Sequence, residues 1–303
     1  MLKDRFNNYI LELQDNICNA LESIDGKAKF LEDKWIREEG GGGRSRVISN
    51  GNVFEKGGVN TSAVEGKLPP AMQQAFGVGE SNFFACGLSL VIHPWNPYVP
   101  TVHANWRYFE LYDGAGNRID RWFGGGSDLT PYYLHEEDGI HFHQTLKDAM
   151  DPFGDGLYEK YKKHCDEYFV NRHRNNEARG IGGVFYDYLR PIDDADAERL
   201  FAFQQSNGNA FVKAYIPIVE KRKDFEYTER ERFWQEIRRG RYVEFNLVHD
   251  RGTLFGLKTN GRTESILMSL PPRARWEYDY HPGPGTREAE LLEYLKPRNW
   301  LRK

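Results

Sequence analysis

The chain has 303 residues, 39% of them hydrophobic and 28% charged, so it is long enough to bury a substantial core without disulfides or structural metals. We expect a single domain over residues 1–303. Acidic and basic residues are mixed along the chain and the formal net charge is only -4, which argues against a basic surface for nucleic acid or a charged membrane anchor.

The first predicted element is an amphipathic helix. Apolar residues recur at steps of three and four over residues 10–24, and Gly26 follows them. The chain start carries acids among its apolar residues, unlike a signal or transit peptide, and no apolar run approaches the length of a membrane span. Cys18, Cys86 and Cys165 are far apart and form no Cys-x-x-Cys pair. We therefore expect a cytoplasmic protein with reduced thiols and no integral membrane association.

Four strands are predicted next. Residues 44–48 and 53–54 flank Asn50-Gly51, and Asn-Gly between two such runs is a strong hairpin signal. Longer strands are predicted at residues 83–93 and Thr101–Tyr112, joined by a loop that contains prolines.

The rest of the chain is mainly helical in pattern. Helices are predicted at residues 136–150, 157–174, 195–206, 229–239 and 287–295, and short strands at residues 184–186, 242–248 and 266–270. Strands are grouped as often as they alternate with helices, and one hairpin is explicit. We therefore expect an α+β fold with a large antiparallel β-sheet flanked by α-helices.

The alternation within strand Thr101–Tyr112 separates polar from apolar residues. His103, Asn105 and Arg107 share one face, because successive side chains of a strand point to opposite sides. The opposite face carries Val102, Ala104, Trp106 and Tyr108. In the preceding strand, Ser89 and His93 share a face in the same way. If the two strands are neighbours, their polar faces form the floor of one site, although a solvated outer face of a sheet gives the same pattern.

Two other features raise questions of metal and phosphate binding. His141 and His143 have ligand spacing on a strand, but in the predicted helix they diverge by roughly 200°, so at most one of them enters a given site. The glycine runs at residues 40–43 and 124–126 lack the spacing of nucleotide-binding loops. They are typical of flaps and tight turns that approach a flat ligand, or of surface loops.

Two turn sequences late in the chain place charged residues at the ends of predicted strands. Asp250-Arg251-Gly252 follows strand 242–248, and Thr259-Asn260-Gly261-Arg262 precedes strand 266–270. If the first strand stays extended, Asp250 lies on its polar face. Strand ends are a usual place for functional groups, but both sequences are also ordinary turns.

Seven segments of the sequence resemble the oxygen-dependent coproporphyrinogen III oxidases in order and spacing. They are residues 35–43, 89–93, 101–107, 122–131, 180–187, 240–252 and 261–277. The resemblance implies a homodimer that converts two propionate groups of coproporphyrinogen III to vinyl groups, giving protoporphyrinogen IX. Molecular oxygen is the implied co-substrate, with no flavin, haem or nicotinamide.

The resemblance also implies roles for individual residues. His103 corresponds to the active-site acid, and Arg107 and Asp250 correspond to positions with roles in the chemistry. The implied substrate-binding residues are Ser89, Asn105, Trp106, Arg107, Asn260, Gly261 and Arg262. The positions that some members use to bind a divalent metal cation are His93, His103, His143 and His173.

One departure from the family pattern concerns the motif near residue 187. Many members have two successive aspartates there, whereas this chain has Asp187-Tyr188, so any carboxylate role rests on Asp187. A non-catalytic tetrapyrrole carrier is an alternative that explains the arginines and aromatic residues but leaves His103 and Asp250 without a task. A histidine-metal hydrolase is a third reading and predicts tightly bound zinc.

Overall fold

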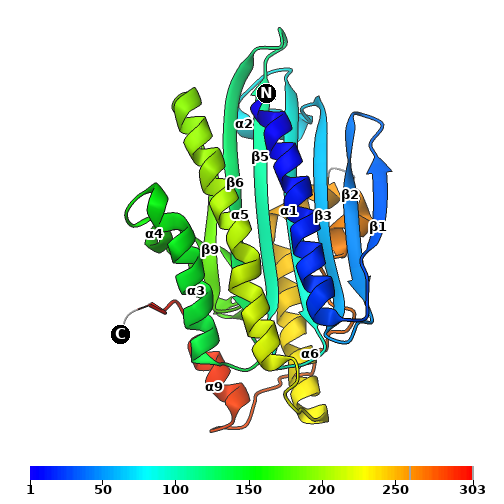
Figure 1. Cartoon of the computed structure of the whole chain (residues 1–303), viewed down its shortest axis with the longest axis vertical. Coiled ribbons are helices and arrows are strands. Elements are labelled where there is room, and N and C mark those ends of the chain that lie inside the picture. The colour runs from blue at the N-terminus through cyan, green and yellow to red at the C-terminus, as the bar shows by residue number, and fades with distance from the viewer. Residues whose placement is uncertain (259–260, 302–303) are drawn as a thin grey trace.

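The computed structural model describes residues 1–258 and 261–301, which fold around one large sheet (Figure 1). Within these residues seven antiparallel strands pair in the order β1-β2-β3-β4-β5-β6-β9. The strands are β1 (Leu31–Ile36), β2 (Gly41–Ser49), β3 (Phe54–Lys67), β4 (Asn82–Pro94), β5 (Thr101–Tyr112), β6 (Arg118–Thr130) and β9 (Gly182–Leu189), while β7 (Val170–Asn171) pairs separately with β8 (Glu177–Ala178). The predicted α+β class with a large antiparallel sheet is confirmed.

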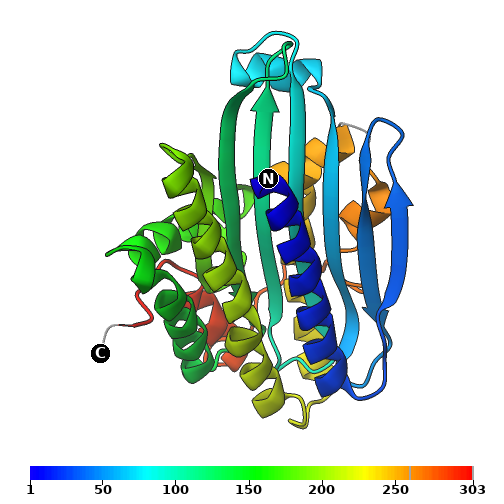
Figure 2. The ribbon, with the colours of Figure 1, turned by 45° about the horizontal axis from the view of Figure 1, so that its top comes forward.

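Helices lie on both faces of this sheet. Figures 1 and 2 show α1 and α5 side by side across one face, with α3 beside α5 and α6 behind the sheet. The α-helices are α1 (Leu2–Asp25), α2 (Pro70–Phe76), α3 (Glu136–Met150), α4 (Leu157–Tyr168), α5 (Asp194–Arg222), α6 (Glu229–Glu244), α7 (Arg251–Lys258), α8 (Thr263–Leu267) and α9 (Arg287–Tyr294). Short 3-10 turns occur at η1 (Asp151–Phe153) and η2 (Arg172–Arg174). No helix among the described residues is long and apolar enough to cross a membrane.

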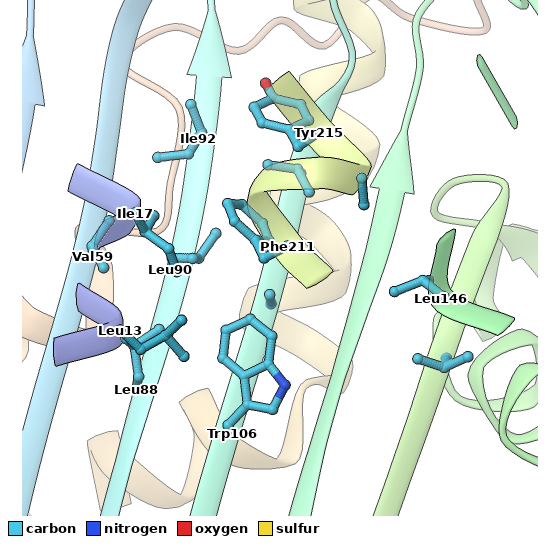
Figure 3. Packing of buried hydrophobic residues seen from close by; sticks show 14 of the residues in the cluster. Leu13, Ile17, Val59, Leu88, Leu90, Ile92, Trp106, Leu146, Phe211 and Tyr215 are labelled. Atoms are coloured by element: carbon cyan, nitrogen blue, oxygen red, sulfur yellow. The ribbon is translucent and has the colours of Figure 1, made fainter. Parts of the chain in front are cut away.

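The main core lies between the sheet and helices α1 and α5. Figure 3 shows Leu13 and Ile17 of α1 close to the side chains of β4, and Phe211 of α5 close to Trp106 of β5. Trp106 is 1% exposed, and its ring meets Phe211 edge-on with 6.2 Å between centroids. Burying a large apolar side chain stabilises a fold by about 1.5–3 kcal/mol. This face fixes the orientation of β5, so the alternate residues of β5 must lie on the second face.

The second face is covered by helices only in part. Near the end of β4, His93 packs edge-on against Tyr242 of α6, with 5.4 Å between ring centroids. The segment after α8 also covers this region, because His93 Nε2 lies 2.9 Å from the Ser269 carbonyl oxygen. Farther along β4, Ser89 is exposed, and on β5 His103 is partly exposed. The middle of the second face is therefore accessible to a ligand.

Two of the predicted strands are helical instead. Residues 242–248 continue α6 into the π-helical turn η3 (Phe245–His249), and residues 266–270 overlap α8. In the first segment the buried side chains are Tyr242, Val243, Phe245 and Asn246, which is a helical spacing. Leu247 and Val248 are apolar yet exposed, so the sequence of this segment alternates as a strand would although the segment is helical. Asp250 therefore follows a helix, and its predicted place on a strand face is wrong.

Most of the two glycine runs lies in strands, and there the prediction of flaps or loops is wrong. Gly40 ends the turn between β1 and β2 with a φ of 128°, which agrees with the predicted tight turn. Gly41 to Gly43 begin β2, and residues 124–126 lie within β6. A Cβ on Gly43 would lie 2.3 Å from the ring of Trp35, and one on Gly124 would lie 2.6 Å from Arg107 Nε. The glycines let side chains of neighbouring strands lie flat across the sheet.

Candidate active site

The polar residues of β4 and β5 lie together on the second face, as the alternation predicted. The two strands are neighbours, with Asn105 directly opposite Ser89 in the antiparallel register. Ser89 is exposed, and His103, Asn105 and Arg107 are partly exposed. One accessible surface therefore presents a hydroxyl, an imidazole, an amide and a guanidinium group.

His103 is held in place by a buried carboxylate. It lies opposite Asp128 in the β5–β6 register, and its Nδ1 is 2.7 Å from Asp128 Oδ1. The carboxylate favours the tautomer whose proton lies on Nδ1 and is donated to Asp128. The His103 Nε2 atom then lies 3.4 Å from Asn105 Nδ2 and can exchange a proton at the accessible surface.

Asp128 is held in turn by Arg179. Both side chains are 2% exposed, and Arg179 Nη2 lies 2.6 Å from Asp128 Oδ2. Burial raises the pKa of Asp128, but the Arg179 charge and the hydrogen bond from His103 outweigh burial and hold that pKa below its usual value. The Arg179 guanidinium also lies 4.1 Å from the centre of the Phe169 ring. Because it is buried, Arg179 acts on the site through Asp128.

Arg107 supplies positive charge to the same surface. Its Nη2 lies 2.9 Å from Asp187 Oδ2, and Arg251 approaches that carboxylate at 3.7 Å. Arg107 Nε is buried and has no hydrogen-bond partner among the described residues. Two guanidinium groups therefore share one carboxylate, which leaves positive charge to bind a carboxylate of a ligand.

Asp250 reaches this surface from the end of η3. Its Oδ1 accepts a hydrogen bond of 2.9 Å from the Tyr168 hydroxyl, and its Oδ2 accepts one of 2.7 Å from the Thr253 backbone N–H. Burial raises the pKa of Asp250, but these hydrogen bonds and the nearby His103 lower it further than burial raises it. The side chain is therefore a carboxylate at neutral pH.

One cluster of aromatic rings, which we call the aromatic wall, connects the three predicted catalytic residues. It consists of Tyr168, Phe169, Phe185 and Phe245. The wall meets His103 at 5.7 Å through Phe169 and Arg107 at 5.9 Å through Phe185, and it holds Asp250 through Tyr168. The structure thus brings together residues from β5 and from the end of η3, which are far apart in sequence.

A family model described as coproporphyrinogen III oxidase matches residues 5–300, which is nearly the whole chain. The chain belongs to the coproporphyrinogen III oxidase family. It is an enzyme of porphyrin and haem biosynthesis, and its reaction is the oxidative decarboxylation of coproporphyrinogen III. The expected membership of the coproporphyrinogen III oxidases and the expected decarboxylation are confirmed, while the use of molecular oxygen stays a prediction.

The predicted substrate-binding residues of this coproporphyrinogen III oxidase do not all lie on the accessible surface. The Trp106 side chain is in the core, because the alternation of β5 turns it away from His103; its predicted role cannot rest on the indole ring. Arg262 pairs with Asp33 of β1 and donates to Ser265 Oγ at 2.9 Å.

The segment before Arg262 is described only in part. The Gly261 backbone N–H donates to the Gly256 carbonyl oxygen at 2.8 Å, and Asn260 lies outside the described residues. In this structure Arg262 is therefore bound to the β1 side of the molecule and not to the residues of β5. Its role toward substrate stays a prediction.

The four histidines expected as metal ligands lie on different elements with different partners. His93 is fully buried, and burial together with nearby positive charge holds its pKa well below the usual value. His143 is buried between the Tyr158 hydroxyl and the Ile181 carbonyl oxygen, and burial lowers its pKa to about 3.

The other two histidines, His103 and His173, also bind separate partners. His103 binds Asp128, and His173 lies 2.7 Å from His249 and 2.9 Å from Glu244. Among the described residues no group of three or more histidine, cysteine or acidic side chains is arranged to hold a metal ion. These histidines do not fit one metal site, and no step below uses a metal.

The site residues predicted from the sequence did not include the side chains that hold His103 and Arg107 in place. Asp128 and Arg179 hold His103, and Asp187 holds Arg107. Asp128 stands in a glycine-rich stretch that resembled a loop, and Arg179 comes just before another. The missing signal was the register of β6 against β5, which places Asp128 directly opposite His103.

Proposed function

We propose that this coproporphyrinogen III oxidase uses molecular oxygen as its electron acceptor. In each step the bond to a propionate carboxylate carbon breaks, a hydrogen leaves the carbon next to the pyrrole ring, and a vinyl double bond forms. Carbon dioxide, one proton and two electrons are released. Two such steps supply four electrons, the number that reduces one oxygen molecule to two water molecules when protons are added.

The protein's own task in this reaction is to position the substrate and to move protons. A porphyrinogen is electron-rich and can give electrons to oxygen itself, so we expect no flavin, haem or nicotinamide. The observation that carries the proposal is the convergence of His103, Arg107 and Asp250 at the aromatic wall. An imidazole, a guanidinium and a carboxylate on one accessible surface are the groups that this chemistry requires.

Each of the three residues suits one part of the substrate. Arg107 binds a propionate carboxylate, and a hydrogen bond of this charge-assisted kind contributes about 1.5–3 kcal/mol. His103 exchanges a proton through Nε2, since its Nδ1 is engaged by Asp128. Asp250 accepts hydrogen bonds from the pyrrole N–H groups and stabilises positive charge on the ring. Ser89 and Asn105 line the floor beside them.

We also propose a cytoplasmic homodimer. The three cysteines are free and buried, which suits a reducing compartment. At the sheet edge, β1 has no second neighbour among the described strands, and its Leu31 and Ile36 are 75% and 92% exposed. An exposed strand edge with apolar side chains is a suitable place for a second copy to bind.

The proposal is tested by incubating the protein with coproporphyrinogen III in air and then oxidising the mixture. We expect protoporphyrin to accumulate, detected by its fluorescence and mass. A tetrapyrrole carrier would bind coproporphyrinogen and leave its mass unchanged, and that result would overturn the proposal.

A further inference from the structure

One bulky side chain beside the site has an unusual backbone conformation. Tyr188 has a φ of 53°, in the left-handed region that costs about 1–2 kcal/mol for a residue with a Cβ. The other non-glycine residues with positive φ among those described are Asn50, Asn175, Asn176 and Asp279. Asparagine and aspartate adopt this conformation more readily than tyrosine, because their short polar side chains can form local hydrogen bonds. Such a conformation persists only where the surrounding structure imposes it, and it is common at binding sites.

A β-bulge in β9 explains the conformation. Tyr186 pairs with Gly125 and Leu189 pairs with Phe123, so Asp187 and Tyr188 together face the single residue Gly124. Regular alternation would turn Tyr188 to the core face if Asp187 faces Arg107. The bulge instead lets two successive side chains reach the second face, and bulges often re-aim side chains beside active sites.

Tyr188 lies at the rim of the Arg107 surface. Its ring centroid is 4.8 Å from that of Trp122, over whose indole ring the Arg107 guanidinium lies at 5.9 Å. Tyr188 is 42% exposed, although its ring packs at a tilt of 50° against Trp122, which is only 9% exposed. Trp122 Nε1 is buried and has no hydrogen-bond partner among the described residues. A half-exposed ring and the guanidinium that we assign to a propionate therefore share Trp122 as a neighbour.

We propose that the β9 bulge makes Tyr188 a substrate-contacting residue, whose ring packs against the edge of the tetrapyrrole beside the propionate that Arg107 binds. This inference rests on the proposed function. The contact is made by the ring, so the hydroxyl is dispensable.

Two variants separate this role from a structural one. Tyr188→Gly removes the ring and suits the left-handed backbone, so we expect the variant to fold and to melt at the same or a higher temperature. Tyr188→Phe keeps the ring and removes the hydroxyl. Tyr227 is the matched control, because it is also 42% exposed but lies in the loop before α6.

Two quantities are measured. One is KM for coproporphyrinogen III, and the other is the dissociation constant of coproporphyrin III, which is determined from the fluorescence of the porphyrin. For Tyr188→Gly we expect both constants to rise roughly 3- to 10-fold, because the variant loses the binding free energy of one aromatic contact. Tyr188→Phe and Tyr227→Gly should stay within about twofold of the wild type.

Unchanged KM and dissociation constant in Tyr188→Gly would overturn the inference and leave the proposed function standing. An equal rise in Tyr227→Gly would also overturn it. A wild-type protein that neither binds coproporphyrin III nor converts coproporphyrinogen III would refute the proposed function, and the inference with it.

Discussion

His103 owes its position to two strands and to the segment between β8 and β9. Strand β5 turns it to the second face, Asp128 of β6 fixes its ring, and Arg179 keeps that carboxylate ionised. The alternation of β5 could be predicted from the sequence, because a period of two is a local property. The partners could not be predicted, since strand register and the position of a residue between β8 and β9 depend on the whole fold.

Replacing His103 by alanine should lower kcat by between one and four orders of magnitude. A positioned acid or base usually contributes about 10²–10⁴-fold. The measurement is the rate of protoporphyrinogen formation by a variant with wild-type circular dichroism. The control is His281→Ala, whose side chain is 79% exposed, and it should keep full activity. Wild-type turnover by a folded His103→Ala enzyme would remove His103 from the chemistry.

Asp250→Asn should lower kcat and kcat/KM together, because it deletes the negative charge that stabilises the ring. Its two oxygens each accept one hydrogen bond, so the amide can keep only one of them, and we expect a stability loss of about 1 kcal/mol. Asp113→Asn is a matched control, since Asp113 also accepts backbone hydrogen bonds in a turn. If folded Asp250→Asn kept most of its kcat, Asp250 would be only a structural residue.

At the scale of elements, local signals predicted β4, β5 and α3 well. The predicted hairpin between β2 and β3 is also confirmed, but its turn lies two residues later than Asn50-Gly51, because the Gly51 N–H donates to the Phe54 carbonyl oxygen and leaves Asn52 and Val53 as the turn. The alternation of apolar and polar residues gave a wrong prediction at η3, because exposed apolar residues there have the spacing of a strand. It failed again in β6, because glycines that make room for Arg107 and Asp187 look like a loop when the partner strands are unknown.

The β2–β3 hairpin is anchored to the end of α1 by Asp25. Its carboxylate accepts hydrogen bonds from the backbone N–H groups of residues 27, 28, 52, 53 and 54, and a Cβ on Gly51 would lie 2.1 Å from it. Burial raises the pKa of Asp25, but these hydrogen bonds outweigh burial and lower it. Its stabilising effect is therefore present above the unfolded pKa of about 3.9 and is lost as the pH falls through the lower folded pKa.

We expect Asp25→Asn to reduce the free energy of unfolding at pH 7 by about 2–4 kcal/mol, because most of these donors lose a charged acceptor. The difference from the wild type should shrink as the pH falls below about 4. Urea unfolding at several pH values measures both effects. The exposed Asp155 provides the control, and Asp155→Asn should change stability little at any pH. A difference that is constant with pH would show that the charge of Asp25 is not what matters.

At the scale of the molecule, the sheet has a closed face and an accessible one. Helices α1 and α5 seal the first face, and this lets the second face carry polar side chains without losing the core (Figure 1). Family resemblance supplied the function, whereas pattern alone left the accessible face equally consistent with an ordinary solvated surface. The convergence at the aromatic wall favours a functional site, and the His103 and Asp250 variants test it.

Assembly is the second property at this scale. We expect the purified protein to have twice the mass of the chain by multi-angle light scattering, because the β1 edge exposes Leu31 and Ile36. A charged residue at the edge should weaken this contact, so Ile36→Lys is expected to shift the equilibrium towards monomers. A wild-type protein that is monomeric at all concentrations would refute the assembly.

The central claim is that oxygen accepts the electrons released by decarboxylation. The most direct test measures oxygen uptake and carbon dioxide release together while the enzyme converts coproporphyrinogen III, with the His103→Ala variant as the control for spontaneous oxidation in air. We expect two molecules of carbon dioxide for each molecule of oxygen consumed by the enzyme, and no carbon dioxide under argon. Carbon dioxide released at the same rate without oxygen would contradict the account.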